Sequence, residues 1–263
     1  MTFNLRADCW IDGKNRWRHR KSQVETLLAE IDADVVGMQE ITLTMRQDLE
    51  AVLTQYQWVG RPRTKRHTAE QTPLLISKRH TVLESETFWL SKNPHRVGSS
   101  IWYSLFPRIC TTAKIQLETG EIIRVYNTHL DCYLSPARSY GLKKIIEYIE
   151  KQQAKDPLPI ILMGDFNTNP SSPLIQGLST GKWGRQPLIA VQEMDSTLYQ
   201  QATMSGFKGR ERGFHLDYIF VSPHYQIKTT EIVKDFKEKR YPSDHYPLLS
   251  TIELAQDLTN GKK

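Results

Sequence analysis

The pattern of apolar residues predicts a buried strand past the middle of the chain. Residues 160–163 are four apolar residues in a row between a proline and a glycine, which is typical of a strand buried on both faces. Asp165 and Asn167 follow, two positions apart. In an extended chain such side chains point the same way, so a carboxylate and a carboxamide would leave the strand end together. An ordinary Asp/Asn turn explains the same residues, so the other strand ends must decide between a turn and a site.

The same pattern predicts the remaining elements. Apolar residues spaced three and four apart predict helices at 24–31, 45–53 and 142–149. Alternation and short apolar runs predict strands at 2–6 (ending at Asn4), 35–38, 74–76, 81–90, 111–117, 122–127, 215–221 and 248–254. The strand at 111–117 alternates with polar residues and is expected to be half-buried. A polar stretch at 8–20, an exposed basic loop at 61–72, an irregular segment at 93–107 and short elements at 171–212 separate them.

Helices and strands alternate in both halves of the chain, and no low-complexity linker divides it. We therefore predict one α/β domain at residues 1–255, followed by a polar tail at 256–263. Such alternation favours two layered sheets covered by helices.

Composition supports a globular protein with a sizeable core. The chain has 263 residues, of which 39% are hydrophobic and 24% charged. No apolar run approaches the ~20 residues that cross a bilayer, and the first residues lack a signal-peptide pattern. Cys9, Cys110 and Cys132 show no CxxC spacing. A disulfide framework or a zinc site is therefore not expected, and a reducing, cytoplasmic compartment is.

The charge is positive and clustered. The formal net charge is +6 and the isoelectric point is about 9.1. Four basic residues lie within 61–66 and another four within 16–21. A phosphate-rich partner explains these clusters, and so does a solvated basic surface.

Polar side chains end or interrupt most of the predicted strands. Each has an ordinary explanation alone, as a solvated strand end, a turn or a hydrogen-bonded histidine. The set is Asn4, Glu40, His129, Asp165, Asn167, Asp217, Asp244 and His245. Asp217 is the hardest to explain as a solvated surface residue, because it stands between Leu216 and Tyr218. In so apolar a run, a carboxylate is costly unless another group pairs with it.

The chemistry of this set is coherent. Carboxylates and carboxamides without thiolates suit Mg²⁺, with Mn²⁺ as an alternative. Two histidines can act on a phosphoryl oxygen near neutral pH, and a separate carboxylate can deprotonate water. Together they form the inventory of metal-assisted phosphoester hydrolysis. The sequence has no GxSxG, P-loop or GxGxxG motif that would favour another chemistry.

Six short segments, in order, resemble the endonuclease/exonuclease/phosphatase superfamily, whose fold is DNase I-like. They are residues 2–6, 37–40, 127–131, 164–167, 216–219 and 243–247. Segments 88–91 and 107–111 resemble a bacterial branch akin to the exonuclease-like deadenylase group. The resemblance implies a four-layer α/β/β/α sandwich of two mainly antiparallel sheets, with the site where the strand ends of both sheets meet.

The resemblance also implies a role for each residue of the set. Glu40 is implied as the principal Mg²⁺ ligand, Asn4 as a second residue of the metal site beside it, and Asp244 as support for this metal or a second one. Asp165 would orient and activate the attacking water. The remaining roles concern the phosphoryl group. Asn167 and His129 would contact it, His245 would contact the scissile phosphate, and Asp217 would hold the His245 tautomer.

The roles of three arginines remain open. Some family members carry an acid where this chain has Arg6, so a second metal ligand is not implied there and Arg6 could face phosphate. Arg108 and Arg138 match the bacterial branch and are candidates for binding substrate phosphate. The alternative for both is a structural ion pair, or a charge near a helix end.

Two functional hypotheses follow. The first is a metal-dependent phosphodiesterase, nuclease or phosphatase. The second is a catalytically silent protein that binds nucleic acid or another phosphorylated ligand. The full set of site residues favours the first. Positive charge favours nucleic acid as the substrate over a small sugar phosphate or nucleotide, and no segment is expected to insert into a membrane.

Overall fold

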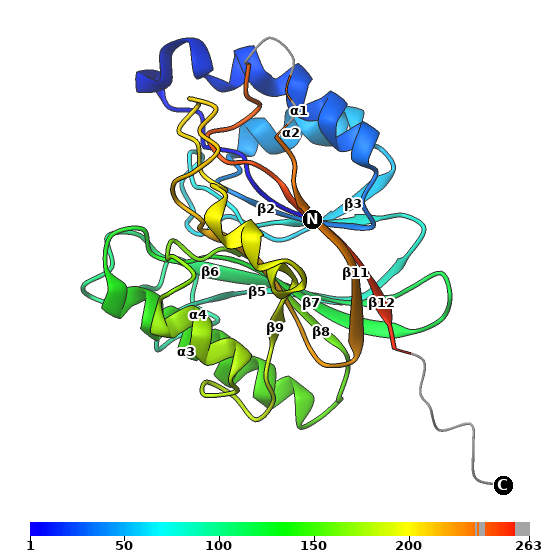
Figure 1. Cartoon of the computed structure of the whole chain (residues 1–263). Coiled ribbons are helices and arrows are strands. Elements are labelled where there is room, and N and C mark those ends of the chain that lie inside the picture. Colours follow the sequence, from blue (N-terminus) through cyan, green and yellow to red (C-terminus); the bar gives the residue numbers. More distant parts are fainter. Residues whose placement is uncertain (235, 237–239, 256–263) are drawn as a thin grey trace, which may run out of the picture.

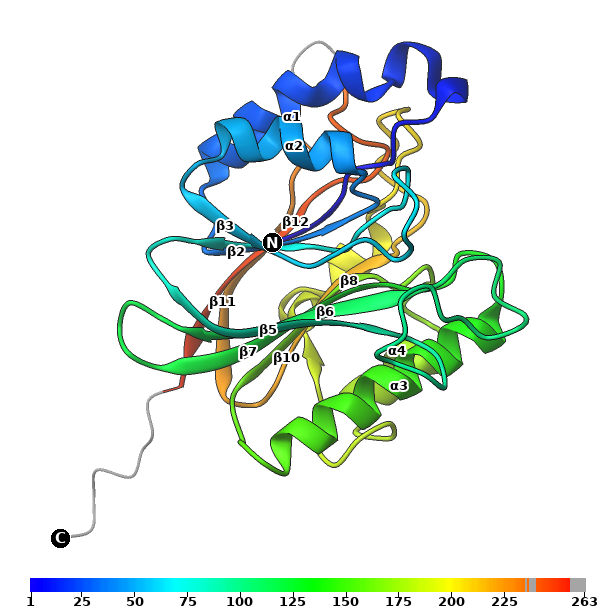
Figure 2. The same ribbon diagram turned by 180° about the vertical axis from the view of Figure 1, so that it is seen from behind.

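Two six-stranded sheets packed face to face form the centre of the protein. The computed structural model describes residues 1–234, 236 and 240–255, so the expected tail at 256–263 lies outside the described residues. Helices α1 (Trp17–Ile31) and α2 (Leu43–Val52) cover one sheet, and α3 (Ser135–Gln153) and α4 (Pro173–Ser179) cover the other (Figure 1). The view from behind shows the same layers in the same order (Figure 2). The four-layer α/β/β/α fold is therefore confirmed.

The first sheet has the strand order β11-β12-β1-β2-β4-β3. Its strands are β1 (Thr2–Asn4), β2 (Val35–Gln39), β3 (Tyr56–Val59), β4 (Leu74–Ser77), β11 (Tyr225–Ile232) and β12 (Leu248–Leu254). β1 and β2 run parallel, and the other neighbours are antiparallel. Strands β3 and β11 were not predicted from the sequence.

The second sheet has the order β5-β6-β7-β8-β10-β9. Its strands are β5 (Thr81–Trp89), β6 (Ile109–Gln116), β7 (Ile122–His129), β8 (Ile160–Asp165), β9 (Ile189–Ala190) and β10 (Asp217–Val221). Only β7 and β8 are parallel neighbours. Short 3₁₀ turns at Trp10–Asn15, Val191–Met194 and Ser196–Gln200 complete the described elements.

Three apolar clusters hold the four layers together. One lies between the sheets and includes Val125 and Ile219. The other two lie between each sheet and its helices. Because the second sheet is covered on both faces, Thr111, Thr112 and Ala113 are all buried. The expected half-buried alternation at 111–117 is therefore absent at Thr112 but present further along, where Lys114 is partly buried, Ile115 buried and Gln116 exposed. β8 is buried along its whole length as predicted.

Two predicted loops also differ from expectation. The polar stretch at 8–20 contains the 3₁₀ turn and the first turn of α1, in which Trp17 and Arg20 are buried. The loop at 61–72 is exposed only in part, because Ala69, Gln71 and Thr72 pack inward. Within the described ranges, none of the helices combines the length and apolarity that spanning a membrane requires.

Candidate active site

Strand register places three candidate residues in one row at an end of the second sheet. His129 on β7 pairs with Asp165 on β8, and Asp165 pairs with Asp217 on β10. In the first sheet, Asn4 at the end of β1 pairs with Gln39, so Glu40 follows directly beside it. The loop before β12 carries His245 to the same place. The sequence argument that remote strand ends meet is therefore confirmed.

The buried carboxylate of Asp165 lies at the centre of this group. Its Oδ2 atom accepts a hydrogen bond from Asn4 Nδ2 at 2.9 Å. His129 Nε2 lies 3.7 Å and His245 Nε2 3.8 Å from the same oxygen, on separate elements. These two distances are too long for direct hydrogen bonds. They leave both ring nitrogens directed at the region where a water or a phosphoryl oxygen could lie.

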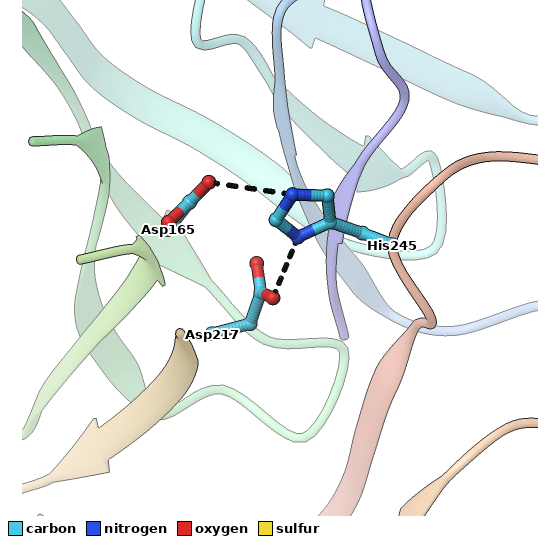
Figure 3. Close-up of side chains that lie close together, drawn as sticks. All are labelled: Asp165, Asp217 and His245. Atoms are coloured by element: carbon cyan, nitrogen blue, oxygen red, sulfur yellow. Dashed lines mark hydrogen bonds and ion pairs between the residues drawn. The ribbon is translucent and has the colours of Figure 1, made fainter. Parts of the chain in front are cut away.

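Asp217 and His245 form a direct pair (Figure 3). The Asp217 Oδ2 to His245 Nδ1 distance is 2.8 Å, and both side chains are buried. Donor atoms of Asp165, Asp217 and His245 all lie within 4.8 Å of one another, a spacing that could hold a metal. At 2.8 Å, however, only a proton fits between the Asp217 and His245 atoms. We therefore interpret this pair as proton-sharing, with any cation elsewhere.

The two histidines have opposite electrostatic surroundings. Burial opposes charge on His245, but Asp217, Asp165 and Asp244 outweigh it and raise its pKa well above the usual range. Burial and the positive charges of Arg108 and Arg63 hold the pKa of His129 well below its usual range. At neutral pH His245 is therefore an imidazolium, whereas His129 is a neutral imidazole with one donor and one acceptor nitrogen.

Asp165 also departs from ordinary carboxyl behaviour. Burial and the nearby charge of Asp217 raise its pKa to about 7, against the stabilising effect of His245 and Asn4. A carboxyl group with such a pKa can exchange a proton with water near neutral pH. Asp165 is therefore suited to act as a base, and the imidazolium of His245, 3.8 Å away, to act as an acid.

Glu40 is anchored by hydrogen bonds. Its Oε1 accepts from Asn4 Nδ2 at 3.1 Å, and its Oε2 accepts from the backbone N–H of Ala7 at 3.0 Å. Burial opposes its ionisation, yet these two bonds lower its pKa, so Glu40 is a carboxylate at neutral pH. Asn4 Oδ1 accepts from the Arg6 backbone N–H at 3.0 Å, so the Asn4 amide nitrogen, not its oxygen, faces the two carboxylates.

The Ser243–Asp244–His245 segment packs against this group. Ser243 Oγ donates to Asn4 O at 2.6 Å and accepts from the His245 backbone N–H at 3.3 Å. Burial, with the charge of Glu40, raises the pKa of Asp244. Arg6 Nε is 3.1 Å from Asp12 and 4.0 Å from Asp244, so its charge is directed at carboxylates.

Asn167 lies beside the group, but not by strand alternation. Its φ of 50° turns the chain directly after β8. Its backbone N–H donates to Asp165 Oδ1 at 2.8 Å, and its Nδ2 donates to Leu130 O at 3.1 Å. The expectation that the chain stays extended through Asn167 was therefore wrong, because the strand ends at Asp165.

The two arginine candidates occupy different surroundings. Arg108 is 8% exposed, its Nε lies 4.0 Å from Asp131, and its Nη2 lies 3.2 Å from Cys132 Sγ. Arg138 donates from Nη1 to the Asp131 backbone oxygen at 3.0 Å, near the start of α3.

Sequence reasoning missed residues that support the site. Thr203 Oγ1 accepts from the backbone N–H groups of Leu216 and Asp217, which holds the start of β10. Arg63 approaches His129 closely enough to affect its pKa. Thr203 has no sequence signal, and Arg63 is marked only as one of the basic cluster at 61–66, so the fold identifies their place beside the site.

The donor set fits a hard divalent cation. Glu40, Asp165 and Asp244 provide carboxylate oxygens without any thiolate. Each Glu40 oxygen accepts one described hydrogen bond, which leaves lone pairs free. The raised pKa values of Asp165 and Asp244 indicate that ionised carboxylates are unfavourable in this buried cluster. A bound cation would stabilise them.

Comparisons with known proteins agree with this fold. An endonuclease/exonuclease/phosphatase protein of Bacteroides vulgatus is 31% identical, covers 97% of both chains and superposes with a TM-score of 0.84. A mannosyl-6-phosphatase of Bacteroides thetaiotaomicron is 24% identical over 96% of this chain and 98% of that chain, with a TM-score of 0.86.

A curated relative, Nocturnin of Drosophila melanogaster, is 23% identical over 94% of this chain but only 44% of its own length. The chain therefore spans less than half of that relative. The model of the Endonuclease/Exonuclease/phosphatase family matches residues 1–245. The chain belongs to this family.

Proposed function

We propose that the protein hydrolyses phosphoester bonds with the help of a divalent cation, Mg²⁺ or Mn²⁺. The observation that carries this proposal is the position of Asp165. Its Oδ2 faces the ring nitrogens of His129 and His245 and the amide of Asn4. Groups from both sheets thus converge on the place where a water and a phosphoryl oxygen must meet.

Asp165 acts as the general base in this proposal. The backbone N–H of Asn167 and the Asn4 amide fix its two oxygens. A carboxylate held in this way can orient a water and remove its proton as the water attacks phosphorus. The position of Asn4 suits orienting both Asp165 and Glu40.

His245 and His129 stabilise the phosphoryl oxygens. The imidazolium of His245, oriented by Asp217, directs a charged N–H into the site. Such a preorganised donor stabilises negative charge that develops on the phosphoryl group. His129, being neutral, contributes one hydrogen bond instead of a charge.

Glu40 holds the cation in this proposal, and Asp244 supports it. When bound there, a divalent ion supplies Lewis-acid polarisation of a phosphoryl oxygen. The backbone of Ala7 and the Asn4 amide orient Glu40, which preserves its geometry for binding.

A small phosphorylated molecule suits this site better than nucleic acid. Part of the positive charge that favoured nucleic acid is already used within the fold. In the basic cluster at 16–21, Arg16 lies 2.7 Å from Asp8 and Arg20 is buried. One similar structure is a mannosyl-6-phosphatase, which agrees with a small substrate. Nucleic acid remains the second candidate.

A substrate panel tests the proposal. The purified protein is incubated with p-nitrophenyl phosphate, bis-p-nitrophenyl phosphate, sugar phosphates, nucleotides, DNA and RNA, with Mg²⁺, Mn²⁺ or EDTA. We expect hydrolysis of at least one phosphoester with metal and none with EDTA. Salt-dependent nucleic-acid binding without hydrolysis of any substrate would instead support the catalytically silent alternative.

A further inference from the structure

A small hollow beside His129 contains unpaired polar groups. Its cavity volume is about 10 Å³, which is room for one water-sized group, and it opens to solvent. Arg63, Thr72, Arg108 and His129 are among the residues that line it. Because His129 Nε2 is also 3.7 Å from Asp165, the hollow adjoins the candidate active site.

Arg108 has a buried N–H donor without a hydrogen-bond partner among the described residues. Its side chain is 8% exposed, and this donor is its Nε. Thr72 Oγ1, which is also buried, likewise has none within the described part of the chain. A buried guanidinium with an unused donor is costly unless an acceptor arrives. Both residues line the hollow, where an anionic oxygen would supply the missing acceptor.

Arg63 brings a second guanidinium to the hollow and is held rigidly. It pairs with Glu70 at 2.8 Å, and its Cζ lies 4.8 Å from the centre of the Phe106 ring. Its backbone oxygen accepts from Trp89 Nε1 at 2.8 Å. These contacts fix the side chain before any ligand binds, which reduces the entropic cost of binding.

The hollow is electrostatically suited to an anion. Burial, with the charge of Arg108, lowers the pKa of Arg63, and both arginines lower the pKa of His129. Glu70 also lines the hollow, and its carboxylate, 2.8 Å from Arg63, offsets part of this positive charge. Guanidinium groups are the residues of choice for binding phosphate through several charge-assisted hydrogen bonds.

We infer that Arg63, Arg108 and Thr72 form a subsite for a second phosphate group of the substrate, next to the phosphoester that is cleaved. This inference rests on the proposed function and narrows it to molecules with two phosphates close together. Glu70, Phe106 and Trp89 position the subsite through their contacts with Arg63.

Paired inhibitors test this inference. Inhibition constants are measured for hydrolysis of p-nitrophenyl phosphate by the metal-loaded protein at constant free Mg²⁺. Adenosine 3′,5′-bisphosphate is compared with AMP, and fructose 1,6-bisphosphate with fructose 6-phosphate. We expect at least one bisphosphate to bind about ten-fold more tightly than its monophosphate. In Arg108→Met and Arg63→Met this ratio falls to about one. The control is Arg66→Met, an exposed residue of the same loop, and it keeps the wild-type ratio.

Thermal shifts by the same four ligands provide a readout that does not need turnover, and melting curves show that each variant folds. If Arg108→Met does not fold, the partly exposed Arg63→Met still decides. A wild-type protein that hydrolyses p-nitrophenyl phosphate but prefers neither bisphosphate overturns the subsite and leaves the proposed function intact. Equal weakening of mono- and bisphosphates in the variants also overturns it, because the arginines would then bind the scissile phosphate.

Discussion

The raised pKa of Asp165, which suits a general base, makes the folded protein less stable at neutral pH. Burial and Asp217 raise its pKa to about 7, whereas an unfolded Asp has a pKa of about 3.9. The folded state therefore binds this proton more tightly. As pH rises from about 4 to about 7, the unfolded carboxyl ionises first and the free energy of unfolding falls.

Replacing Asp165 by Asn removes this effect. In metal-free protein above pH 7, we expect Asp165→Asn to raise the free energy of unfolding by about 2 kcal/mol, and to change it little at pH 4. Urea denaturation at several pH values measures both. Glu84→Gln, an exposed substitution on β5, is the control. A variant that is less stable than wild type at pH 8 contradicts the account.

The Asp217–His245 pair has its own pH signature. The folded pKa of His245 is raised, so the pair stabilises the fold fully below the unfolded pKa of about 6.5. This contribution is lost as pH rises through the folded pKa. We expect Asp217→Asn to cost about 3 kcal/mol at pH 6, with a smaller difference at high pH. NMR titration of the His245 ring provides the second readout, since its pKa should fall in the variant. A difference in the free energy of unfolding between wild type and Asp217→Asn that grows as pH rises would contradict this prediction.

The sequence predicts residues at strand ends well, because position and chemistry coincide there. Glu40, His129, Asp165 and Asp217 are such residues, and strand register brings them together. Thr203 could not be predicted, and Arg63 is marked only as one of the basic residues at 61–66. Which contacts these two residues make depends on the fold, because their partners come from other segments of the chain.

At the scale of elements, the close pairing of β7 and β8 positions the site. Gly164 has a φ of 145°, and a Cβ atom there would lie 2.0 Å from the Thr128 backbone oxygen. Only glycine allows β8 to approach β7 this closely just before Asp165.

Gly164→Ala should therefore move Asp165 away from His129. We expect a loss of about 3 kcal/mol in the free energy of unfolding and a large loss of phosphoester hydrolysis. The matched control is Gly98→Ala, where φ is 79° but the space is open, so only backbone strain applies. Thermal unfolding and turnover are measured together. Equal effects at the two glycines would show that crowding by Thr128 is unimportant.

The elements that the sequence missed share a place in the sheets. β3 and β11 are the two edge strands of the first sheet. Along β11 partly buried and exposed residues mix, so its apolar pattern is weak. Central strands such as β8 are buried on both faces and are therefore easy to predict. The loop at 61–72 was judged by its charge, whereas its stacking on Trp89 and Phe106 depends on the fold.

At the scale of the whole molecule, each sheet supplies half of the site. Asn4, Glu40 and His245 belong to the first sheet or the loops at its strand ends. Asp165 and Asp217 belong to the second. The site therefore exists only while the two sheets are packed together.

Arg20 fastens one of these halves. Its buried guanidinium donates to the backbone oxygens of Leu5, Arg6 and Pro242, and thus ties α1 to the segment after β1 and to the segment before Ser243. The basic cluster at 16–21 is therefore partly structural.

We expect Arg20→Met to lower the free energy of unfolding by about 3 kcal/mol, because three buried carbonyl oxygens lose their donor. Turnover should fall as well, since Arg6 and the 243–245 segment would shift. Arg18→Met, an exposed position on the same helix, is the control. Melting temperature and turnover are recorded for both, and unchanged values for Arg20→Met would show that this tie is dispensable.

The convergence of the two sheets on Asp165 is tested most directly by turnover. Initial rates of phosphoester hydrolysis are measured for wild type and Asp165→Asn with Mg²⁺, on protein shown to be folded. The account predicts a rate at least ~100-fold lower in the variant, and none in wild type after EDTA treatment. Equal rates for the two proteins, or rates that do not respond to removal of the metal, would contradict it.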